Sequence, residues 1–380
     1  MDIQSKFFTY GENEESKLIL HNGKKFGPIT LAYETYGSLN KSKDNAVLVF
    51  HALSGSQHLA GFNSNVDGIK DRWTNECKNG WWDSFVGPGK NINTDHFFVI
   101  CVNYFGGCYG STGPSSINPN TNEYYGSSFP KINFSDIVDS QIPLFKYLGI
   151  EKFHSVIGSS LGGIMALNFS TRYSNMTNNV ISIASGLRAP ILTKTHNLEQ
   201  ILAIENDVNF NNGDYYNSFF PNKGLMLARM ISHKTFVSLR YMKSRMTAKC
   251  EQNENDFKWY KIKTSLESYL LHQGHKFSKR FDANTYAHLI SAWSDFDLKK
   301  DNNADNDFDI FNDCSDHKYL IYTINSDCCF YPEEQEELYN ALLGANIDVE
   351  YITVPSEKGH DSFLLEPELY SDGMQKILKL

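Results

Sequence analysis

This sequence of 380 residues lacks a long apolar run and an excess of basic residues. Its longest apolar stretches, such as 46–50 and 97–102, are far shorter than the ~20 residues that span a bilayer. Lysine and arginine total 35 against 44 aspartate and glutamate, and the net charge of −9 argues against binding the phosphate backbone of nucleic acids. We therefore expect neither a membrane protein nor a nucleic-acid-binding protein.

The seven cysteines are scattered and odd in number, so they do not suggest a disulfide framework. Residues 1–17 contain no basic stretch followed by an apolar one, so we expect no secretory signal and a cytoplasmic location. No H-E-x-x-H, paired C-x-x-C or Walker A motif occurs, and the adjacent Cys328 and Cys329 lack zinc-ligand spacing. We therefore predict no metal site and no bound cofactor.

Strands and helices alternate over the first 185 residues. β-Branched, aromatic and apolar runs predict strands at 29–36, 46–51, 97–103, 153–158 and 179–184. Helical spacing predicts a helix over 136–148, with Ser135 or Asp136 as N-cap, and another over 161–172. This alternation implies right-handed parallel crossovers and an open α/β sheet.

The composition changes between about residues 187 and 310, which are rich in Lys, Asn, Tyr and Met. Helices are predicted near 197–205, 223–246, 256–272 and 283–293, and a solvated connector at 299–309. The strand pattern resumes at 319–325 and 349–354, around a helix at 332–343. We predict an α/β core of residues 1–186 and 311–380, interrupted by a helical lid insertion, residues 187–310, over the carboxyl ends of the strands.

Residues 158–162 read Gly-Ser-Ser-Leu-Gly, a G-x-S-x-G pattern centred on Ser160. The pattern alone is a weak signal, but an apolar strand precedes it and an apolar helix follows it. This setting is typical of a nucleophile elbow, in which glycines flank a strained serine at a helix N-terminus. We predict that Ser160 is a nucleophile. The alternative is a tight turn with an exposed serine.

A serine nucleophile needs a histidine base that a carboxylate orients. Asp327 follows the predicted strand 319–325, and His360 follows 349–354. Both therefore lie at carboxyl ends of strands, where open α/β sheets place their ligands. Either residue alone would more often be a solvated loop residue, but the order Ser160, Asp327, His360 is that of α/β-hydrolases. We predict that these three residues form a catalytic triad.

An oxyanion hole requires two backbone N–H donors. The amide of Leu161 directly follows the nucleophile and is the first candidate. The second should come from loop 51–55, after the strand 46–51, and we assign it to Leu53. The alternative is that 51–55 is only a tight turn.

Several stretches resemble the homoserine O-acyltransferases of the α/β-hydrolase superfamily, over roughly residues 15–370. The matching stretches, among them HALSGSQHLAG and GWWDSFVGPGK, are 51–61, 80–90, 106–119, 125–130, 158–163, 227–231, 280–286 and 359–364. This set is far more specific than G-x-S-x-G alone. The resemblance implies an α/β-hydrolase fold with Ser160, Asp327 and His360 as the triad.

The resemblance also implies that Arg229 and Asp361 bind the amino-acid substrate. Arg229 would hold its α-carboxylate and Asp361 would attract its α-ammonium. The implied reaction passes an acyl group from acyl-CoA to Ser160 and then to the side-chain hydroxyl of L-homoserine, in methionine biosynthesis. The expected partners are acyl-CoA as co-substrate, L-homoserine and a second copy of the chain in a homodimer.

The acyl group is an open choice at this point. Relatives that resemble succinyl-transferring enzymes read Trp-Arg-Phe after the triad aspartate, and here Cys329 stands in place of the arginine, which favours acetyl. However, HALSGSQH and residues 266–286 look close to the succinyl branch, and His58 could supply a positive charge. Homoserine O-succinyltransferase is therefore the main alternative. A serine O-acyltransferase, an esterase or thioesterase with the same triad, and a non-catalytic binding protein are further alternatives.

Overall fold

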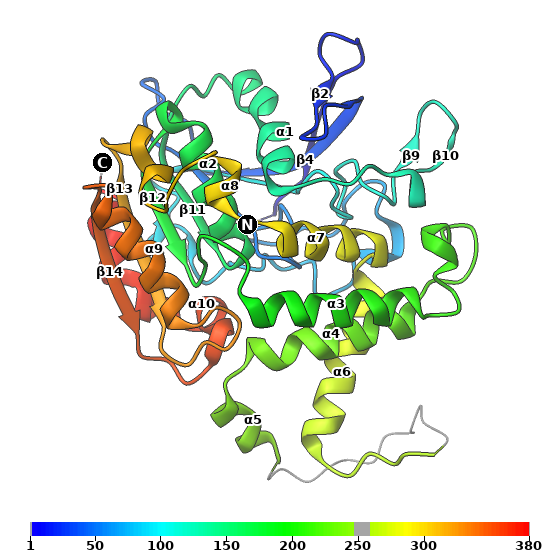
Figure 1. Cartoon of the computed structure of the whole chain (residues 1–380). Helices are drawn as coiled ribbons and strands as arrows, with labels where there is room; N and C mark the ends of the chain where they lie inside the picture. Colours follow the sequence, from blue (N-terminus) through cyan, green and yellow to red (C-terminus); the bar gives the residue numbers. More distant parts are fainter. Residues whose placement is uncertain (1, 247–258, 380) are drawn as a thin grey trace.

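A sheet of eight strands forms the centre of the computed structural model, which describes residues 2–246 and 259–379 (Figure 1). Its strands, in spatial order, are β1 (Lys6–Tyr10), β4 (Ile29–Tyr36), β8 (Phe98–Val102), β5 (Ala46–Phe50), β11 (Phe153–Ser159), β12 (Thr177–Ile183), β13 (Lys318–Ile324) and β14 (Asp348–Val354). The pairs β1–β4 and β4–β8 are antiparallel, and all the other pairs are parallel. The predicted fold class, a mostly parallel open sheet flanked by helices, is confirmed.

All seven predicted strands form, each within two residues of its predicted ends. Strand β1 was not predicted, because it is an edge strand whose residues are mostly exposed or half-buried and give a weak alternation. Outside the main sheet, the described residues form six two-residue strands: β2 (Leu18–Ile19) with β3 (Lys25–Phe26), β6 (Val86–Gly87) with β7 (Ile92–Asn93), and β9 (Ile117–Asn118) with β10 (Glu123–Tyr124).

Helices cover both faces of the sheet and bury its central strands. Helices α1 (Phe134–Tyr147) and α2 (Leu161–Arg172) pack on one face, and α9 (Pro332–Gly344) contacts β13 and β14. Met374 of α11 (Ser371–Ile377) packs into the core of the opposite face. The predicted N-cap of α1 was wrong: Asn133 caps the helix and forms a capping box with Asp136, which is the third residue of the helix.

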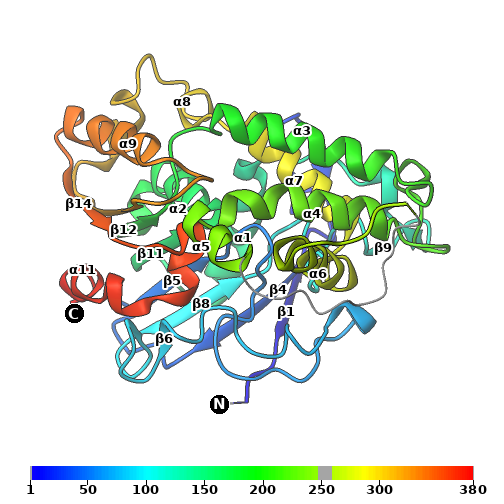
Figure 2. The same ribbon diagram turned by 90° about the horizontal axis from the view of Figure 1, so that it is seen from below.

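A group of helices lies between β12 and β13 in the sequence. Its members are α3 (Ile191–Glu205), α4 (Asn222–Phe236), α5 (Leu239–Met246), α6 (Ser265–Arg280), α7 (Ala283–Asp295) and α8 (Leu298–Asp301). Figures 1 and 2 show α3 and α4 side by side, and α6 packs against α4 while α7 packs against α3.

Three predictions in this group need correction. The helix expected over 223–246 is two helices, because the backbone at Val237 is extended between α4 and α5. The helix expected over 256–272 begins at Ser265, behind a capping box at Thr264, and residues 256–258 lie outside the described residues. The expected connector 299–309 overlaps the short helix α8 and the first residue of a 3₁₀ helix, Asp309–Cys314.

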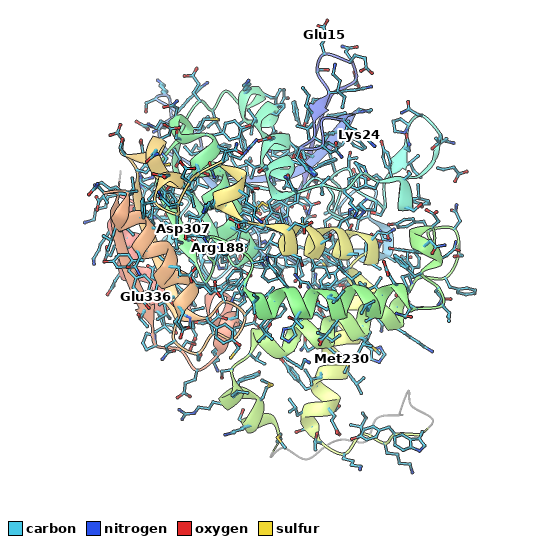
Figure 3. All side chains as sticks on the ribbon, viewed as in Figure 1. Glu15, Lys24, Arg188, Met230, Asp307 and Glu336 are labelled. Atoms are coloured by element: carbon cyan, nitrogen blue, oxygen red, sulfur yellow. The ribbon has the colours of Figure 1, made fainter. Side chains whose placement is uncertain are left out.

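The two ends of this helical group are joined to each other. The Leu298 N–H donates to the Leu187 carbonyl over 2.9 Å. The Arg188 guanidinium pairs with Asp307 at 2.6 Å (Figure 3). It also pairs with Glu337 of α9 at 2.9 Å. The segments by which the chain enters and leaves the helical group, near Arg188 and Asp307, therefore lie side by side next to α9. We call this pair of segments the neck.

Membrane-spanning helices and metal-ligand clusters are both absent from residues 2–246 and 259–379. No helix in these ranges has both the length and the apolar character that crossing a membrane requires. Within the same ranges, no three His, Cys, Asp or Glu side chains come together as metal ligands would. The six cysteines in these ranges are free thiols.

Candidate active site

Ser160 occupies a sharp turn between β11 and α2. Its backbone has φ 57° and ψ −127°, a conformation that a non-glycine residue adopts only where the surrounding structure holds it. A Cβ at Gly158 would lie 1.9 Å from the Gly162 carbonyl oxygen, and one at Gly162 would lie 2.2 Å from the Phe50 carbonyl oxygen. The two glycines of the motif are therefore required by close backbone contacts. Ser160 has the geometry of a nucleophile elbow.

Asp327 and His360 form a buried pair. Nδ1 of His360 lies 2.6 Å from Oδ2 of Asp327, and both side chains are almost fully buried. The other carboxylate oxygen accepts the N–H groups of Cys329 and Phe330 at 2.7 and 3.0 Å. Because Asp327 accepts the Nδ1 proton, Nε2 of a neutral His360 carries the lone pair that a general base needs.

The three predicted triad residues lie at one edge of the sheet, since β11, β12, β13 and β14 are consecutive parallel neighbours. Within the described residues, Nε2 of His360 is buried and has no hydrogen-bond partner, so no hydrogen bond joins it to Ser160 here. Catalytic hydrogen bonds of this kind are often long until substrate binds. The structure thus joins Asp327 to His360 and places Ser160 at the same edge without that last bond.

The loop after β5 is a tight turn in which the Gly55 N–H donates to the Ala52 carbonyl at 2.9 Å. Among the described residues, neither Leu53 N–H nor Leu161 N–H donates to another group. The closeness of Gly162 to the Phe50 carbonyl oxygen brings the start of α2 against this loop. Two unpaired amides at adjoining backbone segments are what an oxyanion hole requires.

Arg229 lies on α4, with its guanidinium between two aromatic rings. The centroids of Phe236 and Phe277 are each 4.9 Å from its Cζ. Its Nε is buried without an acceptor, and no carboxylate among the described residues lies within the 4.0 Å that defines an ion pair. Burial, with the nearby charge of Arg280, lowers the pKa of Arg229. The side chain is thus a cation without a bound anion.

Asp361 follows His360 directly and faces the same cavity as Arg229. The cavity has a volume of about 270 Å³, and its lining residues are Arg229, His233, Val237, Tyr241, Tyr269, Gln273, Lys358, Asp361 and Leu365. Burial raises the pKa of Asp361 to about 6, although the charges of His360 and Arg229 act in the opposite direction. A separated cation and carboxylate on one cavity suit a ligand that carries both an anionic and a cationic group.

His58 cannot supply the positive charge for an acyl group that the sequence suggested. Its Nδ1 lies 2.8 Å from the Glu34 carboxylate and its Nε2 lies 3.0 Å from the Lys78 carbonyl, with the ring almost fully buried. Cys329 is also buried, and burial followed by the charge of Asp327 raises the pKa of its thiol. Neither residue presents a free cation.

Sequence reasoning gave no role to Arg280, although it lies in the matching stretch 280–286. It ends α6 and donates from Nη1 to the Ser54 carbonyl at 3.0 Å and to the Tyr109 hydroxyl at 2.9 Å. Tyr109 lies in the glycine-rich loop 106–113. The signal that pointed to Arg280 was only its place in a matching motif.

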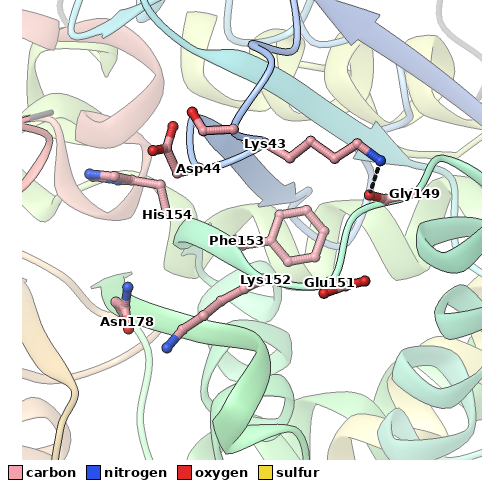
Figure 4. A pocket seen from close by; sticks show the side chains of 9 residues that line it. Lys43, Asp44, Gly149, Glu151, Lys152, Phe153, His154 and Asn178 are labelled. Atoms are coloured by element: carbon pink, nitrogen blue, oxygen red, sulfur yellow. Dashed lines mark hydrogen bonds between the residues drawn. The ribbon is translucent and has the colours of Figure 1, made fainter.

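Figure 4 shows a larger cavity, with a volume of about 310 Å³. It lies where β5 and β11 begin, whereas Ser160 follows the end of β11. Lys43 on its rim donates from Nζ to the Gly149 carbonyl at 2.9 Å. Both ring nitrogens of His154 are engaged, by Ser155 and by the Lys379 carbonyl. Lys43 and His154 of this cavity are therefore already paired within the chain, whereas Arg229 beside Asp361 has no carboxylate partner among the described residues.

Known proteins resemble this chain over nearly its whole length. Residues 45–367 match the α/β hydrolase fold family. A homoserine O-acetyltransferase of Methanococcus vannielii is 42% identical over 352 residues, which are 92% of this chain and 68% of the relative. A homoserine O-succinyltransferase of Saccharophagus degradans is 40% identical over 360 residues, which are 93% of this chain and 91% of the relative. The crystal structure of a homoserine O-acetyltransferase from Bacillus anthracis superposes with a TM-score of 0.87 at 24% identity. The superposition covers 100% of this chain and 98% of that one.

Proposed function

Because this chain belongs to the α/β hydrolase fold family and, within it, to the homoserine O-acetyltransferases, we propose that it transfers an acetyl group from acetyl-CoA to the side-chain hydroxyl of L-homoserine. The observation that carries the proposal is the buried Asp327–His360 pair beside a cavity that holds an unpaired cation, Arg229, and a carboxylate, Asp361. This arrangement supports acyl transfer to an acceptor that is itself an amino acid.

In the proposed first half-reaction, Nε2 of His360 takes the proton of the Ser160 hydroxyl as the oxygen attacks the thioester carbonyl of acetyl-CoA. The amides of Leu53 and Leu161 stabilise the resulting oxyanion. The carbon–sulfur bond then breaks, His360 returns the proton to the sulfur, and CoA leaves. Asp327 holds the imidazole tautomer and stabilises its charged form throughout.

In the proposed second half-reaction, L-homoserine binds with its α-carboxylate on Arg229 and its α-ammonium near Asp361. His360 removes the proton of the side-chain hydroxyl, whose oxygen attacks the acetyl-Ser160 carbonyl. Collapse of this intermediate returns the proton to Ser160 and releases O-acetyl-L-homoserine. The reaction needs no cofactor beyond the co-substrate acetyl-CoA, and its product places the enzyme in methionine biosynthesis.

Homoserine O-succinyltransferase is the second candidate, because one relative of that name is 40% identical to this chain. A succinyl group carries a distal carboxylate, which a buried site would have to pair with a cation. The side chain two residues after Asp327 is the uncharged, buried thiol of Cys329, and His58 is already occupied by Glu34. Both observations support acetyl as the donor group.

The test is a steady-state comparison of acetyl-CoA and succinyl-CoA as donors, each with L-homoserine and L-serine as acceptors. The proposal predicts the highest kcat/KM for acetyl-CoA with homoserine. A preference for succinyl-CoA would support the second candidate. CoA release at the same rate with and without an amino-acid acceptor would contradict transfer and indicate an esterase or thioesterase.

We assign residues 1–186 and 311–380 to the hydrolase core and residues 187–310 to a lid over the site. The neck between Arg188 and Asp307 supports this division. So does the contact of α4 with the turn Gly359–Asp361. Just after α4, Ser238 also approaches this turn, since a Cβ at Gly359 would lie 2.5 Å from the Ser238 nitrogen. We also infer a cytoplasmic enzyme, because its six described cysteines are free thiols, as a reducing compartment would keep them.

We further propose that two copies pair through the lid. On α3, Ile191, Leu198 and Leu202 are 84%, 58% and 47% exposed. Their spacing places them along one side of the helix, where contiguous apolar surface is typical of an interface. Light scattering should report a dimer for the unaltered chain and a monomer for the double variant Leu198→Glu/Leu202→Glu. A monomeric unaltered chain would contradict the dimer.

A further inference from the structure

Arg280 joins the helical lid to the loop that carries Leu53. It is the last residue of α6, and its Nη1 donates to the Ser54 carbonyl at 3.0 Å. Tyr109, almost fully buried, accepts from the same nitrogen at 2.9 Å and donates its hydroxyl proton to the Arg280 carbonyl at 2.9 Å. Arg280 is therefore fixed at both its backbone and its side chain.

The Ser54 carbonyl begins a chain of two peptide groups that ends at Leu53. It belongs to the Ser54–Gly55 peptide, whose N–H donates to the Ala52 carbonyl at 2.9 Å. That carbonyl belongs to the Ala52–Leu53 peptide, whose N–H has no acceptor among the described residues. We call this chain, from Arg280 through these two peptides to the Leu53 N–H, the peptide relay.

Each bond in the peptide relay has the same direction. A cation that donates to a carbonyl polarises its peptide and makes the N–H of that peptide a stronger donor. Two peptides in series pass this effect from the guanidinium to the Leu53 N–H. Nδ1 of the buried His51, which lies 2.8 Å from the Ala52 carbonyl, adds a second donor to the same carbonyl.

The charge of Arg280 is not cancelled locally. No carboxylate among the described residues lies within the 4.0 Å of an ion pair from its guanidinium. The Phe277 ring lies 5.3 Å from Cζ, and an aromatic face does not neutralise a cation. An uncompensated positive charge thus stands at the start of the peptide relay, in a partly buried site where water screens it little.

We propose that Arg280 is a positioning residue that fixes the loop 51–55 and, through the peptide relay, strengthens the Leu53 N–H as an oxyanion donor. This inference rests on the proposed function only in taking Leu53 as one of the two oxyanion donors. The proposal also gives the lid a role in the reaction, because the positive charge of Arg280 lies at the end of helix α6 of the lid. A displacement of α6 would weaken the oxyanion hole without touching Ser160.

The test compares the unaltered chain with Arg280→Gln, Arg280→Lys and Tyr109→Phe. Glutamine keeps a donor but no charge, and lysine keeps the charge. Tyr109→Phe is the matched control, because it leaves the Arg280–Ser54 bond in place. Two measurements are made: the single-turnover rate of Ser160 acetylation by p-nitrophenyl acetate, and the inhibition constant of phenylboronic acid, which forms a tetrahedral anionic adduct with an active serine.

The peptide relay predicts that Arg280→Gln slows acetylation about tenfold, a part of the ~10²–10³-fold that complete loss of an oxyanion donor costs. Phenylboronic acid should bind about tenfold more weakly to this variant, since the same N–H stabilises its adduct. Arg280→Lys should retain more of both properties than Arg280→Gln, and Tyr109→Phe should retain nearly all.

Equal rates and inhibition constants for Arg280→Gln and the unaltered chain would overturn the proposal. So would equal losses in Arg280→Lys and Arg280→Gln, because keeping the charge would then make no difference. The ester and the boronate involve neither CoA nor homoserine. An unaltered chain that reacts with both probes but transfers nothing to homoserine would therefore overturn the proposed function and leave the peptide relay supported by its own variants.

Discussion

Asp327 and Asp361 lie close together in this site but in opposite environments. The Asp327 carboxylate accepts two backbone N–H groups and contacts His360, so its oxygens are fully engaged. Asp361 forms no hydrogen bond or ion pair with the described residues, and burial raises its pKa to about 6. Arg229, on the same cavity, likewise has no carboxylate partner within ion-pair distance among these residues.

The difference in hydrogen bonding separates a group that binds the chain's own residues, Asp327, from groups that we expect to bind a ligand, Arg229 and Asp361. A buried polar group without a partner destabilises the fold, so a chain retains one only where something else offsets that cost. Asp327 orients a permanent partner and is satisfied. Arg229 and Asp361 gain their partners only when a molecule with both charges binds, which is how we interpret the cavity.

The largest expected effect comes from replacing Ser160, the residue on which the engaged Asp327–His360 pair is proposed to act. Ser160→Ala should reduce kcat by about 10⁶-fold, because the proposed nucleophile is gone and its partners cannot replace it. The melting temperature should stay nearly unchanged, since the Ser160 hydroxyl forms no hydrogen bond with the described residues and alanine removes only this one oxygen. Substantial residual transfer by this variant would show that another group accepts the acyl chain.

Asp327→Asn tests the fully engaged carboxylate. The amide keeps an oxygen for the backbone donors but presents N–H to His360, so the imidazole should adopt the wrong tautomer. A loss of about 10⁴-fold in kcat is expected, as for other triads of this kind. Both half-reactions should slow equally, and a loss confined to the homoserine step would contradict the assigned role.

Arg229→Ala tests the unpaired cation. Losing a charged hydrogen bond to the homoserine carboxylate should cost about 3 kcal/mol, or about 100-fold in kcat/KM for homoserine. Acetylation of Ser160 by acetyl-CoA should be spared. Arg229→Lys is the matched control and should recover part of the loss, since it restores the charge without the paired donors. Equal loss in both half-reactions would remove Arg229 from the substrate site.

Asp361→Asn tests the unpaired carboxylate and has the smallest expected effect. With a pKa raised to about 6, Asp361 is ionised above that pH and protonated below it. The KM for homoserine should therefore rise as the pH falls through about 6, and it should be nearly flat in Asp361→Asn. Around neutral pH, the variant's KM should be about tenfold higher. If the KM of Asp361→Asn for homoserine still rose as the pH fell through about 6, a group other than Asp361 would set this pH dependence.

Much of the fold could be predicted because its signals are local. Buried strands such as β5 and β8 read as continuous apolar runs, and the G-x-S-x-G pattern identified the turn at Ser160 from its own flanks. The edge strand β1 gave no such signal. The break between α4 and α5 was also missed, because it depends on tertiary contacts of Val237 and Ser238 with the turn at Gly359.

Some residues and contacts of the candidate site could be predicted from the sequence, and others could not. Chain order and strand ends were enough to bring Asp327 and His360 together, and their hydrogen bond is present. The hydrogen bond between His360 and Ser160 is not formed, which strand order could not reveal. The role of Arg280 could not be foreseen, because a bond to a backbone carbonyl 226 residues away leaves no trace in local spacing.

The central claim is that Ser160 carries the acyl group between two substrates. Its most direct test is the intact mass of the chain after brief exposure to acetyl-CoA, followed by addition of L-homoserine. We predict a gain of one acetyl group, absent in Ser160→Ala, that homoserine removes as O-acetyl-L-homoserine forms. A chain that forms the product without ever gaining this mass, or that gains it equally in Ser160→Ala, would contradict the account.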